Sequence, residues 1–461
     1  PEIFAGSSDK NKQSNDGNSS QNARQNMFSR LSYDYSGKYL AQFTFRRDGS
    51  PNFPKNKRFG YFPGASIGWR ISEESFMKKY TFIDNLKLRA SWAKMGNDQV
   101  GSYQYLTTYS FGNNYVIGGN DVAGIVQNGV PNSNITWEVA KTTNLGFDAR
   151  LWKGLLNIEF DYFKTRRSNI LTTRSAIIPD YTGLKLPDEN VGIVNNKGFE
   201  LTISHENYAN PVKYMVSGNV SFARNKVIFC DEQPAAEPYQ YATGHPIGSA
   251  LYYKAIGIFE SQEQINANPH FVNTQPGDVM YADMNNDGTI DARDRIRVDK
   301  TNMPEVVYAI SGSLEYKGFD FSLLFQGQNN AKQYFDSWFQ VMSYSLGDFL
   351  QWRADGRWTP ENTKATMPRG TSGLWNNNTI QSTQWLLDAG FLRLKNLELG
   401  YTLPHKISNK VSLKNVRVSF SANNLLIIYD HMRKLGFDPE TSNYWYYPQQ
   451  RTLNFGINVT F

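Results

Sequence analysis

Oxygen-bearing side chains recur at alternate positions between residues 283 and 294, in the run DMNNDGTIDARD. A calcium ion takes about six to eight oxygen ligands, and a tight loop can present them from alternate positions. Because every ligand comes from the protein, the segment predicts a structural Ca²⁺ rather than a catalytic one. The alternative is an ordinary Asx-Gly turn that holds no metal. The predicted ligands are Asp283, Asn285, Asp287, the backbone carbonyl of Thr289, Asp291 (directly or through water) and Asp294.

Tryptophan and tyrosine residues gather in the long segments that join the predicted strands. Flat aromatic rings suit sugar rings and also peptide side chains. These residues are therefore candidate contacts for a ligand or a partner protein. The alternative is that they form an interfacial aromatic girdle or pack one loop against another. They are Trp338, Trp352, Trp358, Trp375 and Trp385, followed by Tyr444, Trp445, Tyr446 and Tyr447.

Motifs for catalysis are weak. Residues 64–68 match G-x-S-x-G, but a nucleophile elbow needs a strand, a sharp turn and a helix. Here the strand-like alternation continues from Ser66 through Trp69. The five histidines show no H-E-x-x-H spacing, and nothing selects a pair of carboxylates. An enzyme is therefore not expected.

The elements that would position these residues follow a period of two. In the last segment, small or polar residues separate the apolar residues Leu453, Phe455, Ile457, Val459 and Phe461. Successive side chains of a strand point to opposite faces, so this segment is a strand with one apolar and one polar face. The pattern recurs at 156–162, 213–222, 396–403 and 416–423. There are about fourteen such segments, each close to the ten or so residues of a tilted membrane strand.

A soluble β-sandwich would show the same alternation, but two features favour a transmembrane antiparallel β-barrel. The segments are longer than the five or six residues of most soluble strands. The connections are also unequal: residues 316–318 form a tight turn and residues 404–409 a short one, whereas roughly 45 to 60 residues separate other strand pairs. The predicted fold class is therefore an all-β membrane barrel with long loops on one side.

The composition agrees with a membrane barrel. Of the 461 residues, 14% are aromatic and 20% charged, and the mean hydropathy is −0.54. An apolar outer face, a wet interior and aromatic girdles give such values. Cys230 is the only cysteine, which excludes an internal disulfide and a C-x-x-C pair. The net charge of +6 is spread along the chain, so no nucleic-acid partner is indicated.

Several segments resemble, in order and spacing, the C-terminal half of SusC/RagA-family TonB-dependent outer-membrane transporters of Bacteroidota. They are FRRDGS at 45–50, RFGYFP at 58–63, IGWR at 67–70, LKLRAS at 86–91, ITWE at 135–138, NKGFE at 196–200, YKGFD at 316–320 and the final Phe461. The resemblance implies a barrel of about twenty-two strands, of which residues 1–461 supply the C-terminal part. It also implies that Phe461 is a signal for barrel assembly.

The same resemblance implies partners and a mechanism. A SusD-like surface lipoprotein would deliver an oligosaccharide or peptide cargo, and TonB would act through a plug domain and TonB box that are not part of residues 1–461. Pro1 is therefore not expected to be the natural start of the protein. The barrel would be surrounded by outer-membrane lipid.

The expected orientation follows from the strand count. With Phe461 at the periplasmic side, counting back through the short turns puts residues 260–304, and with them the calcium loop, outside the cell. No consistent assignment of strands is possible around residues 225–249. Two alternatives to an active importer remain: a passive or structural outer-membrane barrel, and a soluble calcium-binding β-protein or adhesin.

Overall fold

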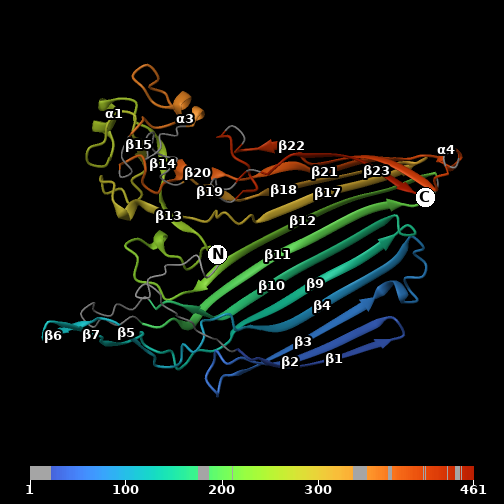
Figure 1. Cartoon of the computed structure of the whole chain (residues 1–461), viewed down its shortest axis with the longest axis horizontal. Helices are drawn as coiled ribbons and strands as arrows, with labels where there is room; N and C mark the ends of the chain where they lie inside the picture. Colours follow the sequence, from blue (N-terminus) through green and yellow to red (C-terminus); the bar gives the residue numbers. More distant parts are fainter. Residues whose placement is uncertain are drawn as a thin grey trace, which may run out of the picture.

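The main element of the fold is one antiparallel sheet of thirteen strands, in which successive long strands are neighbours (Figure 1). The computed structural model describes residues 22–174, 186–209, 211–335, 350–371, 376–408, 410, 412–432, 435–441, 447 and 449–461. The sheet strands are β1 (Gln25–Tyr35), β2 (Tyr39–Gly49), β3 (Phe59–Arg70), β4 (Ile83–Asn97), β9 (Glu138–Leu151), β10 (Leu156–Thr172), β11 (Glu189–Asn207), β12 (Val212–Phe229), β17 (Val306–Tyr316), β18 (Phe319–Asn329), β21 (Phe391–Thr402), β22 (Asn415–Asp430) and β23 (Thr452–Thr460). The all-β antiparallel prediction is confirmed, with thirteen strands in this sheet where about fourteen were expected.

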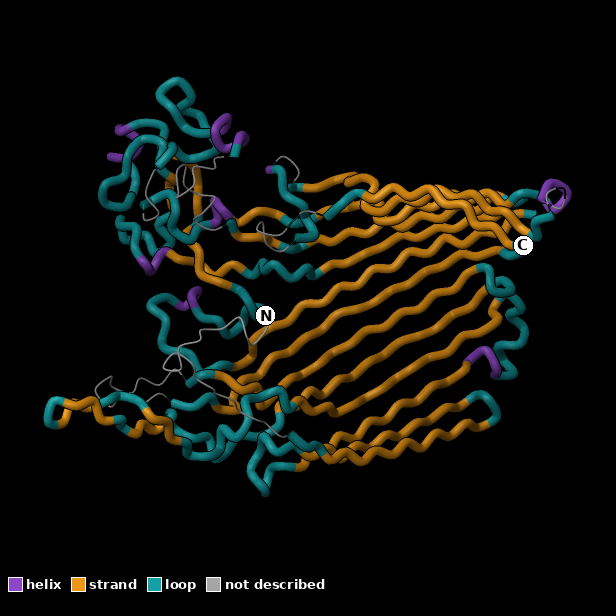
Figure 2. The backbone as a smooth tube through the Cα atoms, viewed as in Figure 1, coloured by secondary structure: helices purple, strands orange, loops and turns teal. Residues whose placement is uncertain are grey.

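Short and long connections lie at opposite ends of the sheet (Figure 2). At the short-turn end, tight hairpins join β1 to β2 and β17 to β18. Lys317 and Gly318 have φ angles of 47° and 88°, and a two-residue type I′ turn needs positive φ at both positions. At the long-loop end, residues 98–137, 230–305 and 330–390 connect successive sheet strands. The predicted tight turn is thus confirmed, and this division of loop lengths is typical of a transmembrane barrel.

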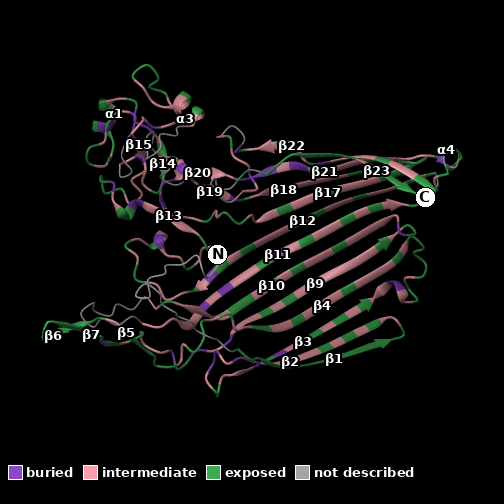
Figure 3. Cartoon of the chain, in the orientation of Figure 1, coloured by how far each residue is buried: buried purple, intermediate pink, exposed green. Residues whose placement is uncertain are grey.

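Each sheet strand has an apolar and a polar face because successive side chains point to opposite sides. Figure 3 shows the resulting alternation of exposure along the strands. The register keeps each face continuous: Ile158 lies opposite Ile203, and Glu159 lies opposite Thr202. Phe455 on β23 is 83% exposed although it is fully apolar. The sheet therefore offers one apolar face and one polar face to its surroundings.

Smaller elements are concentrated in the connections. At the short-turn end they are η3 (Ile71–Glu73) and α4 (His405–Ser408). At the long-loop end they are β5 (Tyr109–Phe111), β6 (Tyr115–Ile117), β7 (Asn120–Val122), β8 (Ile125–Gln127), η5 (Pro238–Gln240), β13 (Ala250–Tyr253), β14 (Ala255–Ile258), α1 (Gln262–Ala267), β15 (Val279–Tyr281), η6 (Ala292–Asp294), β16 (Arg295–Val298), β19 (Lys332–Tyr334), α3 (Gln351–Gly356), η7 (Thr383–Trp385) and β20 (Leu386–Asp388). Residues 225–249, which sequence could not assign, contain the end of β12 and the turn η5.

The buried hydrophobic clusters lie mainly among the loops (Figure 3). Phe62 on β3 is a residue of the sheet that joins one of them. Residues 250–298 pack against residues 350–371 and 376–389, and we term this unit the loop cap. One of its clusters contains Ile258, Val279, Tyr281 and Ile290. Ile290 belongs to the predicted calcium loop, and its burial in this cluster anchors that loop to β14 and β15. None of the described helices is long and apolar enough to span a membrane.

Candidate functional site

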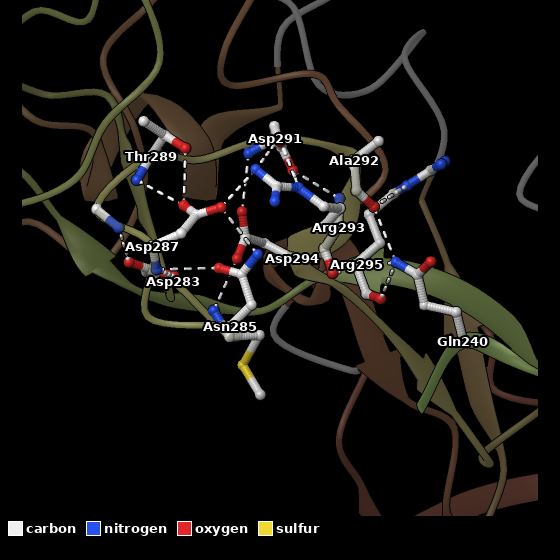
Figure 4. A network of polar contacts seen from close by, with 12 residues as sticks. Gln240, Asp283, Asn285, Asp287, Thr289, Asp291, Ala292, Arg293, Asp294 and Arg295 are labelled. Atoms are coloured by element: carbon white, nitrogen blue, oxygen red, sulfur yellow. Dashed lines mark hydrogen bonds and ion pairs between the residues drawn. The ribbon is translucent and has the colours of Figure 1, made fainter. Parts of the chain in front are cut away.

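The predicted calcium loop lies between β15 and η6, on the loop cap (Figure 4). Asp283 Oδ2 accepts a hydrogen bond from Gly288 N at 2.8 Å, and Asn285 Oδ1 accepts one from Asp287 N at 3.2 Å. Asp287 Oδ1 accepts hydrogen bonds from the backbone N and the Oγ1 of Thr289, at 3.0 and 2.7 Å. The φ of Gly288 is 83°, which permits the sharp turn. These contacts gather the first predicted ligands along one short turn.

An arginine and a buried carboxylate occupy the second half of this loop. Asp294 is fully buried, and its carboxylate accepts hydrogen bonds from Met284 N and Asp291 N, both at 2.8 Å. The Arg293 guanidinium pairs with Asp291 at 2.9 Å and also with Asp287 (Figure 4). A cationic side chain therefore already neutralises two of the predicted metal ligands.

The donor set fits Ca²⁺ in chemistry, because it consists of hard carboxylate and amide oxygens. Its arrangement is less favourable. Among the described residues, no group of three or more His, Cys, Asp or Glu side chains is placed to hold a metal ion. The predicted ligands, Asp283, Asn285, Asp287, Thr289, Asp291 and Asp294, would hold the ion only after Arg293 has moved away from Asp287 and Asp291. Calcium binding at this loop stays a prediction.

Hydrogen bonds also set the ionisation of the loop. The Thr289 hydroxyl, together with the Thr289 backbone and the Asn285 amide, lowers the pKa of Asp287 below its ordinary value. Hydrogen bonds from Arg293 lower the pKa of Asp291 in the same way. Both carboxylates therefore remain ionised in mildly acidic solution without any metal.

The aromatic candidates have different surroundings. Trp385 is almost fully buried, and its Nε1 donates to Asn378 O at 2.7 Å, so it serves to pack the loops. Trp358 packs partly against the hydrophobic cluster of the loop cap, and Trp352 lies half-buried on α3. Tyr447 is exposed. Trp338, Trp375, Tyr444, Trp445 and Tyr446 lie outside the described residues. Contact with cargo or a partner stays a prediction for this group.

A buried polar network that sequence reasoning missed joins the two segments of the loop cap. Asp278 accepts hydrogen bonds from Arg369 Nε at 2.6 Å and from Asn378 Nδ2 at 2.9 Å. Asn378 in turn accepts one from Val279 N at 2.8 Å. These partners are far apart in the chain, so no local pattern signals them. The network holds the connection after β12 against the connection after β18.

On the polar face, a charged cluster crosses three neighbouring strands. Arg89 on β4 reaches Asp161 on β10, with Nη1–Oδ1 and Nη2–Oδ2 distances of 3.0 and 2.9 Å. It also contacts Asp148 on β9 at 2.7 Å. Gly146 on β9 lies opposite both Arg89 and Asp161, and its missing side chain leaves room for the ion pair.

A second cluster repeats this arrangement on the same polar face, closer to the sheet edge formed by β23. Arg417 on β22 reaches across β21 to Asp320 on β18 at 2.5 Å, and contacts Glu398 on β21 at 2.6 Å. A Cβ atom on Gly400 of β21 would collide with both Asp320 and Arg417. The weak sequence signal for each cluster is a glycine on the polar face of a strand whose neighbours carry opposite charges.

A third charged group fixes the segment after β22 to the sheet. Arg393 on β21 is only 1% exposed; its Nη2 contacts Asp438 at 2.7 Å and its Nη1 contacts Glu440 at 3.4 Å. Lys395 also pairs with Glu440, at 2.6 Å. A buried charge is tolerated when opposite charges and hydrogen bonds compensate for lost hydration. The predicted strands contain no sequence feature that would identify these partners.

The remaining predicted residues fall where the strand pattern puts them. Ser66 lies within β3, opposite Gln42 and Ser91, so the G-x-S-x-G match is not a nucleophile elbow. Phe461 follows β23 directly and is exposed at the short-turn end (Figure 1). Residues 260–304 lie at the opposite, long-loop end.

Comparison with known proteins gives consistent relatives. Residues 3–425 match the family model described as TonB dependent receptor-like, beta-barrel. The chain is 29% identical over 471 residues to TonB-dependent receptor P3 of Formosa agariphila, covering 94% of this chain and 45% of that protein. It is 27% identical over 452 residues to TonB-dependent receptor SusC of Bacteroides thetaiotaomicron, covering 94% of this chain and 43% of SusC.

Solved structures show the same fold. The chain matches the RagAB peptide importer in its open-open state with a TM-score of 0.77 and 22% identity, covering 97% of this chain and 49% of the matched chain. The structure of the RagAB peptide transporter gives a TM-score of 0.76 at 22% identity, with coverages of 95% and 47%. The chain thus spans less than half the length of these relatives. It belongs to the TonB-dependent receptor β-barrel family, resembles SusC and RagA within it, and is a β-barrel chain of the bacterial outer membrane.

Proposed function

We propose that this chain supplies part of the wall and outer loops of an active importer that carries oligosaccharides or oligopeptides across the outer membrane. The observation that carries the proposal is the sheet itself, with its apolar face, its charged polar face and its long loops at one end. The apolar face suits lipid, and the polar face suits a passage for cargo rich in hydroxyl and amide groups. The family match supports transport rather than catalysis.

The proposed partners follow from the relatives. A SusD-like surface lipoprotein would dock on the long-loop end and deliver cargo to it. TonB would act on the part of the full-length protein that corresponds to the rest of the relatives' length. Two RagAB structures are described as a peptide transporter and a peptide importer, which favours a peptide cargo. The Trp-rich loops are equally suited to sugar rings, so both classes enter the test.

Uptake by cells tests the mechanism. A strain lacking the full-length gene should lose uptake of one labelled pool, either oligosaccharides or oligopeptides, and regain it when the gene is restored. A strain that lacks TonB but keeps the gene should show the same loss, because the import step draws its energy through TonB. Uptake that persists without TonB would instead identify a passive barrel.

Orientation can be tested by labelling single cysteines on intact cells. In a full-length protein carrying Cys230→Ser, Val272→Cys lies at the long-loop end, where Val272 is 83% exposed. Lys317→Cys is the matched control in the tight turn at the short-turn end. A membrane-impermeant maleimide should label only Val272→Cys, and both variants after permeabilisation. Labelling of Lys317→Cys alone would reverse the orientation, and recovery of the protein in the soluble fraction would support the calcium-binding β-protein.

A further inference from the structure

Four neighbouring strands carry an unbalanced charge pattern on their apolar face. β9, β10, β11 and β12 lie side by side in the sheet (Figure 1). In their regularly paired parts, residues 139–151, 156–168, 195–207 and 214–226, the apolar face carries no Asp or Glu. The Lys and Arg residues of this face all lie toward the long-loop end. We term them the basic belt: Lys141, Lys164, Arg166, Lys197, Arg224 and Lys226.

The strand register brings these cations close together. Lys164 lies directly opposite Lys197, and Lys141 lies directly opposite Arg166. Lys226 continues the belt on β12. Side chains that lie directly opposite each other have Cβ atoms about 5 Å apart, and like charges at such positions destabilise a sheet. From β9 to β12 the belt extends over three strand spacings, roughly 14 Å.

Most of the belt is not neutralised by carboxylates of the chain. Arg224 forms an ion pair with Glu305, which precedes β17, at 2.6 Å. The other five cations are exposed and form no ion pair with any residue that the structure describes. On the polar face, by contrast, Arg89 and Arg417 each contact carboxylates on neighbouring strands. The belt therefore has an excess of positive charge that an anion from outside the chain can neutralise.

The belt begins where the apolar surface ends. Tyr162 on β10 lies opposite Leu145 on β9 and Phe199 on β11. Phe222 on β12 lies opposite Phe199, so a row of large apolar side chains crosses the four strands. Lys164 follows Tyr162 by two residues, which puts it roughly 7 Å beyond this row. Because Tyr residues of membrane barrels sit at the boundary between hydrocarbon and head groups, the belt lies at head-group level.

The other end of the same face has no such belt. There Ala149 lies opposite Ile158, and the His205 ring stacks on Tyr214 with 5.6 Å between the ring centroids. A surface suited to anionic lipid in both leaflets would carry cations at both ends. Here they lie only at the long-loop end, which the proposed orientation puts in the outer leaflet. That leaflet of a bacterial outer membrane is rich in lipid A, a glucosamine disaccharide lipid that carries phosphate.

We propose that the basic belt binds the phosphorylated head group of lipid A in the outer leaflet. The inference rests on the orientation given under the proposed function, with the long loops outside the cell. Lys164 and Lys197 bind phosphate oxygens through charge-assisted hydrogen bonds, as do Lys141 and Arg166. The belt is wider than a single phosphate and suits a disaccharide head group, whose acyl chains lie along the apolar face below Tyr162. Bound phosphate removes the repulsion between the opposed cations and stabilises the pairing of β9, β10 and β11.

Native mass spectrometry of the full-length protein in detergent micelles tests this proposal. Purified lipid A is titrated into delipidated protein, and the bound fraction gives the affinity. Each basic residue near an anionic lipid surface contributes about a factor of five in affinity. Lys164→Gln with Lys197→Gln should therefore weaken binding roughly twentyfold, whereas Lys164→Arg with Lys197→Arg should bind as the wild type does. The matched control is Lys153→Gln with Lys317→Gln, which removes two exposed cations from turns at the short-turn end and should leave the affinity unchanged.

A second variant protects the test against a folding defect in the first. Lys141→Gln with Arg166→Gln removes the other opposed pair and should weaken lipid A binding to a similar extent. Phosphatidylglycerol, which has one phosphate and a small head group, should bind the wild type at least tenfold more weakly than lipid A, and so should dephosphorylated lipid A.

The possible failures are distinguishable. Equal lipid A affinity of both Gln pairs in the belt and of the control, or equal affinity of the wild type for lipid A and phosphatidylglycerol, would overturn this inference and leave the import proposal standing. Absence of any lipid A binding would do the same. Labelling of Lys317→Cys alone on intact cells would instead reverse the orientation, and this inference would fail with it.

Discussion

Gly146→Ala tests whether the missing side chain on β9 is what allows Arg89 to reach Asp161. A Cβ at this position would lie 2.5 Å from Asp161 Oδ1, 2.6 Å from Phe160 O and 3.0 Å from Arg89 Nη2. The two charged side chains can rotate away, but the Phe160 carbonyl belongs to the backbone of the neighbouring strand. The substitution must therefore displace β10 locally or separate the ion pair.

The expected cost follows from these contacts. Overpacking of this kind costs about 1–3 kcal/mol, and loss of a partly exposed ion pair adds up to about 1 kcal/mol. Alanine returns about 0.4–1 kcal/mol, because it restricts the unfolded chain more than glycine does. We expect a net loss of about 2 kcal/mol in the free energy of unfolding, close to a thirtyfold fall in the ratio of folded to unfolded protein.

Urea unfolding of the full-length protein in detergent micelles measures this loss, since folded barrels migrate differently from unfolded chains on unheated SDS gels. Gly218→Ala is the control: Gly218 lies on β12, and its added Cβ would have no atom within 4 Å. The control should change the free energy of unfolding by no more than about 0.5 kcal/mol. Adding Asp161→Ala to Gly146→Ala removes the nearest contact and should recover part of the loss. Equal stability of the Gly146→Ala and Gly218→Ala proteins would refute the reasoning.

Three further predictions concern the loop cap. Arg293→Ala should strengthen Ca²⁺ binding to the full-length protein, because it frees Asp287 and Asp291, whereas Asp287→Asn should weaken it. Calorimetry measures both effects. If neither the wild type nor Arg293→Ala gives a heat of Ca²⁺ binding, the segment is a metal-free turn. The folded pKa values of Asp287 and Asp291 are lowered from the ordinary 3.8, so their contribution to stability is complete above that pH and is lost as the pH falls through the lowered values. The protection factors for hydrogen exchange at residues 283–294 should therefore fall only in strong acid, and a fall in these protection factors near neutral pH would contradict this assignment. Asp278→Ala removes the carboxylate that pairs with Arg369 and should lower the local stability of the loop cap by about 3 kcal/mol, seen as faster hydrogen exchange at β15 with unchanged exchange in β12.

Much of the fold could be predicted because its signal is local. Alternation along a strand sets which side chains share a face, and Tyr316-Lys317-Gly318 encodes its turn through the backbone freedom of its own residues. The interpretation of Ser66 as a strand residue followed from the same alternation. The number of sheet strands was less certain, because short pairs such as β14 with β15 carry the same pattern in the loops.

The sites depended on contacts between distant segments. Asp278 and Arg369 are 91 residues apart, and Arg89 and Asp161 are 72 apart, so no spacing rule could have paired them. The spacing of the calcium loop was visible in the sequence, but the position of Arg293 over Asp287 and Asp291 was not. The sequence by itself therefore determined the strands, their two faces, the tight turn and the family resemblance, because each depends on neighbours along the chain. Only the tertiary structure decided which charges pair across strands, how the loops close into a cap and which cations gather on the apolar face, because these depend on strand register and on contacts between separate segments.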